Sequence, residues 1–153
     1  MELTLLGTGH PAPNPNRAGP SQLVRIGDDC LLVDCGSGAV RRLVEAGHRP
    51  ADVDRVFITH MHSDHTIDLG HFIISRWIEF PTTGLTLIGP PGLREYLDNL
   101  LRLLAWDIDV RDFETRLSTE VRRIEVIEID DAWSMEDDRW GVRAIRVDHA
   151  PVE

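Results

Sequence analysis

The sequence contains no lysine, so all 16 basic residues are arginine, and 26 acidic residues give a formal net charge of −10. This acidic balance argues against a general affinity for nucleic-acid backbone, which requires a positively charged surface, although a local basic patch is not excluded. Long apolar runs are also absent, so no segment has the length of a transmembrane helix. The start, MELTLLGTGHP, lacks the basic flank and the long apolar region of a signal peptide. We therefore expect a cytoplasmic protein without a membrane partner.

Cysteine is scarce as well, with Cys30 and Cys35 both in the stretch DDCLLVDCG. Their odd separation would point them to opposite faces of one strand, so they cannot form a local disulfide. Two cysteines at this spacing do not match a zinc-binding pattern either. We expect two buried thiols in a reducing compartment.

Short apolar segments separated by turn residues predict a layered α/β protein, and a chain of 153 residues is near the length of one domain. Strands are expected at 3–7, 21–27, 30–36, 53–60, 85–89, 122–129 and 141–149, and helices at 37–47, 66–80, 90–106 and around Phe113 and Leu117. The strand at 30–36 is almost continuously apolar and should be buried on both faces. The helix at 37–47 places Val40, Leu43 and Val44 on one face. The acidic stretch 128–140 is expected to be a solvated turn.

The stretch FITHMHSDHTIDLG, residues 57–70, contains three of the seven histidines and an aspartate within six positions. His60 and His62 are two apart at the end of a predicted strand, where extended backbone places their side chains on the same side. Asp64 and His65 follow at the turn into the next helix, a position where α/β sheets bind ligands. Imidazole and carboxylate donors suit zinc, manganese or iron, and the absence of thiolate argues against a structural zinc site.

Four ligands on so short a loop cannot all close around one ion without strain, which favours two ions. His60 and His62 are then assigned to one metal, and Asp64 and His65 to a second. Two ions about 3.5–4 Å apart can hold a bridging hydroxide and stabilise both the attacking and the leaving oxygen of a displacement. Each ion still needs ligands from elsewhere in the chain.

The motif THMHSDH resembles the His-x-His-x-Asp-His signature of the metallo-β-lactamase superfamily. The stretches LLVDCGSGAVRRLVEAG, DRVFITHMHSDH and LTLIGPPGLREYL resemble its ribonuclease Z and arylsulfatase-like branch, and VDHAPVE is similar to that branch's next ligand motif. The resemblance implies that His60, His62 and His149 hold the first metal. It also implies that Asp64 and His65 contribute to the second, with Asp64 orienting or deprotonating the bridging water.

The same resemblance makes Asp34 a carboxylate that orients a metal ligand. The residues alone leave Asp34 open as a strand-end turn residue, and they favour an ordinary surface histidine at position 149. The implied cofactor is two zinc ions, with manganese or iron as alternatives, and zinc can lower the pKa of a bound water to about 7.

Three further positions bear on the site. Where the superfamily pattern has glycine, this chain has Asp68, whose carboxylate could disturb substrate approach or add a polar contact. His71 is expected to face solvent, and His10, in the loop 10–20, is a candidate substrate contact.

The superfamily fold is a four-layer αββα sandwich, and the resemblance covers about its first half. The later motifs, a bridging aspartate and a final histidine, are not found, so we expect a single domain over 1–153 that is incomplete at its C-terminus. The missing half would come from a continuation of the chain or from a second polypeptide. An uncovered apolar sheet face would favour a homo-oligomer, and this chain alone should hydrolyse little.

The leading hypothesis for the complete protein is a metal-dependent hydrolase of phosphodiesters, like ribonuclease Z acting on precursor transfer RNA. One alternative is a hydrolase of small sulfate, phosphate or carboxylic esters, which needs no nucleic-acid surface. Another is a non-catalytic module that binds one metal and assembles with a partner chain.

Overall fold

The computed structural model describes residues 1–115 and 124–149, which form a six-stranded sheet, a separate hairpin and helices. The strands of the sheet are neighbours in the order of the sequence: β1 (Glu2–Gly7), β2 (Ser21–Ile26), β3 (Asp29–Val33), β4 (Arg55–Phe57), β5 (Leu85–Gly89) and β6 (Ile124–Glu128). The first three strands are antiparallel, and β3 to β6 are parallel. The hairpin pairs β7 (Trp133–Glu136) with β8 (Gly141–Ala144).

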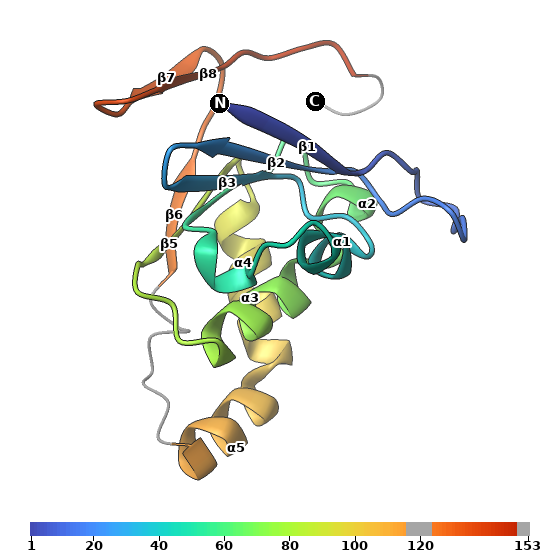
Figure 1. Ribbon diagram of the computed structural model, residues 1–153, viewed down its shortest axis with the longest axis vertical. Coiled ribbons are helices and arrows are strands. Elements are labelled where there is room, and N and C mark those ends of the chain that lie inside the picture. Colours follow the sequence, from blue (N-terminus) through green and yellow to red (C-terminus); the bar gives the residue numbers. More distant parts are fainter. Residues whose placement is uncertain (116–123, 150–153) are drawn as a thin grey trace.

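Helices cover one face of the sheet because parallel strands require crossover connections. The helices are α1 (Ala39–Glu45), α2 (Ser63–Thr66), α3 (Leu69–Ile78), α4 (Leu93–Leu103) and α5 (Ala105–Thr115), with a 3₁₀ turn η1 (Pro50–Asp52). Figure 1 shows α1, α3 and α4 below the sheet and the β7–β8 hairpin above it. The layered α/β architecture expected from the sequence is therefore confirmed.

The core lies between the sheet and these helices. Leu23, Leu32, Val56 and Leu87 are register partners across β2 to β5, so alternation places them in one row on the helix side. They pack in one buried cluster with helix residues such as Leu43, Phe72, Ile73 and Leu93. Each buried side chain of this size stabilises the fold by about 1.5–3 kcal/mol relative to exposure. This packing holds the carboxyl ends of β3 and β4 in place.

The opposite face of the sheet carries both apolar and polar side chains, and its apolar residues are unevenly covered. Leu31 and Ile88, on the central strands, are buried, whereas Leu3 and Leu5 on the edge strand β1 are each 60% exposed. Apolar exposure on this face is therefore greatest toward the β1 edge.

The predicted helix over 66–80 is wrong in its bounds, because the structure contains two helices there. The short helix α2 begins at Ser63, and α3 begins only at Leu69. Between them, the backbone N–H of Asp68 donates to the carbonyl of Cys35 at 3.0 Å instead of continuing the helical ladder. A contact between segments far apart in sequence therefore divides the helix.

The solvated turn predicted for 128–140 is also wrong, since β7 lies inside it. Residues 133–136 alternate between half-buried and exposed, a period-two pattern that the acidic composition obscured. The strand predicted over 141–149 ends earlier, at Ala144.

The last predicted helix differs in position. The helix α5 begins at Ala105 and includes Phe113, whereas Leu117 lies outside the described residues. In α1, Val40 and Leu43 are buried as expected, but Val44 is 55% exposed. Within the described ranges, no helix is both long and apolar enough to span a membrane.

Candidate metal centre

The histidine cluster lies where β3 and β4 end and the chain turns into α2. The backbone N–H of Ile58 donates to the carbonyl of Ile88 at 2.7 Å, which continues the strand pairing beyond β4. The N–H of Asp34 donates to the carbonyl of Phe57 at 2.7 Å, so the ends of β3 and β4 are tied together. The loop that carries His60 and His62 therefore starts from a fixed edge of the sheet.

Three histidines converge at this edge. The Nε2 atom of His60 lies 3.0 Å from the Nδ1 atom of His62. His149, in the segment that follows β8, joins them, with its ring centroid 4.8 Å from that of His60. The potential ligand atoms of the three residues all lie within 4.8 Å of one another. His149 is exposed, as the residues alone suggested, but it belongs to this cluster.

Asp64 and His65 form a second pair of donors on the short helix α2. The Nε2 atom of His65 lies 3.7 Å from an Asp64 carboxylate oxygen, and both side chains are largely buried. The ring of His65 is also close to His60, at 4.0 Å between centroids. Both pairs of donors named from the sequence therefore lie side by side.

Asp34 holds this arrangement in place through hydrogen bonds to His65 and Thr59. It is buried, and its backbone adopts a left-handed conformation with φ of 59°, which aspartate tolerates better than most residues. One carboxylate oxygen accepts a hydrogen bond from Nδ1 of His65 at 2.8 Å, and the other accepts from the backbone N–H of Thr59 at 2.8 Å. With Nδ1 held in this way, the Nε2 atom of His65 is the one left to face Asp64.

Thr59 is a site residue that the sequence reasoning missed. Its hydroxyl lies 3.0 and 2.9 Å from the two Asp34 oxygens and 3.0 Å from Nδ1 of His60. A hydroxyl has a single proton, so one that donates to Asp34 can only accept from the N–H of His60. The Nε2 atom of His60 is then unprotonated and directed at the cluster. A hydroxyl residue directly before the first histidine was the available signal.

Burial lowers the pKa of His60, and the nearby His65, His62 and His149 rings lower it further when charged. A neutral imidazole is the form that binds a metal. The environment of His60 therefore favours the protonation state that a ligand needs.

The donor set fits a divalent transition metal. Four-coordinate zinc with nitrogen ligands at about 2.0–2.1 Å holds those ligands about 3.4 Å apart. The 3.0 Å separation between His60 and His62 is close to this value, and the whole triad lies within 4.8 Å. Imidazole nitrogens with an adjacent carboxylate are also the chemistry that such ions prefer.

Asp68 makes a polar contact within the fold. Its carboxylate accepts a hydrogen bond from the backbone N–H of Val40 at 2.9 Å, near the start of α1. His71 faces solvent as expected, with its side chain 61% exposed. The Nδ1 atom of His10 accepts a hydrogen bond from the N–H of Ala12 at 3.3 Å, and its contact with substrate stays a prediction.

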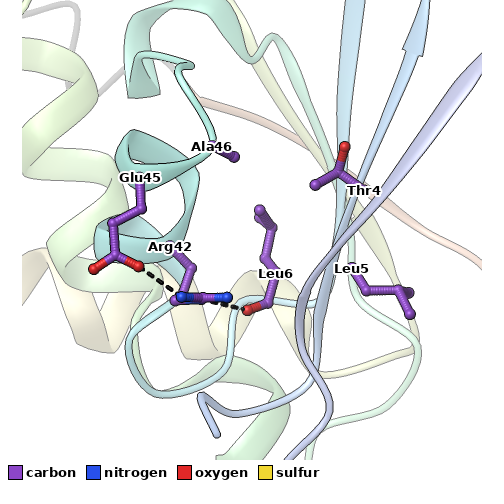
Figure 2. Close-up of a pocket in the computed structure, with 6 residues that line it drawn as sticks. All are labelled: Thr4, Leu5, Leu6, Arg42, Glu45 and Ala46. Atoms are coloured by element: carbon purple, nitrogen blue, oxygen red, sulfur yellow. Dashed lines mark hydrogen bonds and ion pairs between the residues drawn. The ribbon is translucent and has the colours of Figure 1, made fainter. Parts of the chain in front are cut away.

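A pocket of about 140 Å³ lies away from the cluster, between β1 and α1 (Figure 2). The charged side chains that line it bond to each other and to the backbone. Arg42 donates to the carbonyl of Leu6 at 3.1 Å and to Glu45 at 2.7 Å. None of the site residues named above lines it, and we assign it no ligand.

Curated relatives of the chain are ribonuclease Z proteins. That of Mycolicibacterium gilvum (strain PYR-GCK) is 40% identical over 157 residues, which cover 99% of this chain and 54% of the relative. That of Mycolicibacterium paratuberculosis (strain ATCC BAA-968 / K-10) is 41% identical over 155 residues, which cover 99% and 55%. The chain thus spans about half the length of these proteins.

The fold is also that of solved structures. Human tRNase Z, short form, superposes with a TM-score of 0.75 at 24% identity, over 97% of this chain and 60% of that one. A metallo-β-lactamase fold protein of Bacillus subtilis gives 0.61 at 22% identity, over 89% and 48%. The fold class expected from the sequence is therefore confirmed. The family model described as Anti-Pycsar protein Apyc1 matches residues 1–152, and the chain belongs to this family of the metallo-β-lactamase fold.

Proposed function

We propose that the chain is the N-terminal half of a metal-dependent phosphodiesterase. The observation that carries the proposal is the convergence of His60, His62 and His149 at the carboxyl end of the sheet, with Asp64 and His65 beside them. The curated relatives named ribonuclease Z support phosphodiester chemistry.

The residues divide into two ligand groups. His60 through Nε2, His62 through Nδ1 and His149 would hold the first ion, and Asp64 and His65 would contribute to the second. When bound, the ions supply Lewis-acid stabilisation and a water of lowered pKa. Asp64 would orient or deprotonate that water, and Asp34 keeps His65 oriented through its 2.8 Å hydrogen bond. Zinc is the expected ion, with manganese or iron as alternatives.

The substrate we propose is RNA, specifically precursor transfer RNA. The net charge of −10 requires that any RNA contact use a local arginine-rich surface. Small sulfate, phosphate or carboxylic esters are the second candidate, because they need no such surface. Affinity for transfer RNA that falls steeply with salt concentration would separate the first candidate from the second.

We expect full activity to require metal ligands beyond the five residues named here. The second ion has only two proposed ligands here, so we expect little hydrolysis by this chain alone. A C-terminal half, continuous or supplied as a second polypeptide, would add the remaining ligands, and we expect a homo-oligomer in the cytoplasm. If a single ion binds and no turnover follows even with that half, the chain is a metal-binding module.

Metal content and phosphodiester turnover test the proposal together. Purified chain, with and without the C-terminal half of a ribonuclease Z relative, is assayed by elemental analysis and with bis(p-nitrophenyl) phosphate. We expect turnover only with both halves, and its loss in His62→Ala but not in the control His71→Ala, since His71 faces solvent. Equal metal binding by the two variants would refute the assignment.

A further inference from the structure

The β7–β8 hairpin is fastened to the six-stranded sheet at its tip, residues 137–140. Arg139 donates to one carboxylate oxygen of Asp29 at 2.7 Å, and the indole N–H of Trp140 donates to the other at 2.8 Å. Asp29 begins β3, and its side chain is largely buried. Both oxygens of one buried carboxylate therefore hold the hairpin.

Arg55 of β4 adds a second attachment at the same place. Its guanidinium lies over the Trp140 ring, 5.3 Å from the centroid, and 3.9 Å from the carboxylate of Asp137. Arg55 itself is fixed by Asp54 at 2.9 Å. In the described part of the chain, the hydrogen bonds and ion pairs between the hairpin and the sheet all lie at this tip.

The hairpin leads directly to His149. Strand β8 ends at Ala144, and the residues that follow include exposed Ile145 and Val147. The backbone N–H of Arg146 donates to the Asp131 carboxylate at 3.5 Å, which ties this segment to the residues just before β7. A two-stranded hairpin is marginally stable by itself. The position of His149 beside His60 and His62 therefore depends on where the hairpin is fastened.

Strand β3 thus has one aspartate at its first position and another directly after its last. Asp29 holds the hairpin that leads to His149, and Asp34, just past the other end, holds His65 and Thr59. In Figure 1 the β2–β3 turn and α2 lie at opposite ends of the sheet. One rigid, buried strand sets the distance between the hairpin anchor and the histidine loop.

We propose that Asp29 is a positioning residue for the first metal: through Arg139 and Trp140 it fixes the β7–β8 hairpin and so brings His149 to His60 and His62. This inference rests on the proposed function, because it assigns His149 a metal to bind. It adds a residue remote from the ligands whose loss should loosen the site.

A double-mutant cycle tests it. Zinc affinity of the 153-residue chain is measured by competition with a chromophoric chelator for wild type, Asp29→Asn, His149→Ala and the double variant. We expect Asp29→Asn to weaken zinc binding about tenfold, the lower end of the range for residues that orient ligands. In the His149→Ala background, Asp29→Asn should have no further effect, since it acts through His149.

The control and a second variant complete the design. Asp28→Asn removes the same charge from the adjacent, exposed residue and should leave zinc affinity unchanged. Trp140→Phe keeps a ring over Arg55 but removes the indole donor, and it should weaken binding in the same direction even if Asp29→Asn fails to fold.

The possible results are distinct. Equal affinity for wild type, Asp29→Asn and Trp140→Phe would overturn the inference while leaving the proposed function intact. An equal loss from Asp29→Asn with and without His149 would also overturn it, because the effect would then be general destabilisation. If wild type binds no zinc, manganese or iron, the proposed function fails and the inference with it.

Discussion

Replacing Thr59 with valine isolates the hydrogen bonds beneath the histidine cluster. The hydroxyl contacts both Asp34 oxygens and Nδ1 of His60 at 3.0 Å or less, and valine removes it while keeping a branched side chain. A hydrogen bond to a charged group contributes about 1.5–3 kcal/mol. The Asp34 side chain is only 4% exposed, but Thr59 is exposed, so solvent weakens this bond and the lower end of the range applies. We expect the free energy of unfolding to fall by an amount near that lower end.

The loss should not be larger, because Asp34 keeps other donors. One oxygen still accepts from the N–H of Thr59 and the other from His65, so no oxygen is left unpartnered. His60, in contrast, loses the acceptor that orients its ring. Changes to such orienting groups typically reduce metal affinity by about ten- to a hundredfold, and we expect Thr59→Val to fall in this range.

Urea unfolding of the metal-free chain and zinc competition measure the two effects separately. Thr59→Ser retains the hydroxyl and is the matched control, so it should stay close to wild type in zinc affinity. If serine and valine variants lose affinity equally, the hydroxyl does not orient His60. Wild-type affinity in Thr59→Val would contradict the proposed role in the same way.

Two other changes probe separate parts of the fold. Asp68→Ala removes the carboxylate that accepts from Val40 at 2.9 Å, so we expect a loss of about 1 kcal/mol in urea unfolding with zinc affinity unchanged; a large loss of affinity would place Asp68 in the site. Burial, with a smaller contribution from Asp52, raises the pKa of Cys30 to about 11 from 9.0. The folded state thus favours the neutral thiol, a stabilisation present below pH 9.0 and lost between 9.0 and about 11, worth about 2–3 kcal/mol. Unfolding measured across this range should show a steeper decline in wild type than in Cys30→Ala.

Much of the fold could be predicted because local patterns and tertiary structure agree. The strands β1, β2, β3, β5 and β6 lie inside or within a residue of the predicted segments, since each is a short apolar run between turn residues. Agreement failed where a distant contact overrode the local pattern. The bond from Asp68 to Cys35, which divides the helix, joins residues 33 positions apart and leaves no local trace.

The site residues could also be predicted where they are close in sequence and not where they depend on distant contacts. His60, His62, Asp64 and His65 stand within six positions, so closeness in sequence, with strand geometry for His60 and His62, predicts that they share one location. His149 is separated from them by more than eighty residues, and only the family resemblance pointed to it. Thr59 was missed because its role depends on the buried Asp34 oxygens, which become its partners only when β3 and β4 pair.

The two proposed ion positions differ in how far this chain can build them. The first has three nitrogen donors, two from the loop after β4 and one from the segment after β8. The second has Asp64 and His65, both from the short helix α2. Ligands from distant parts of the chain are held in place by the whole fold. Two ligands on one short helix leave most of an ion's coordination positions open. We therefore propose that the residues described here can hold the first ion, and that the second needs ligands from another segment or chain.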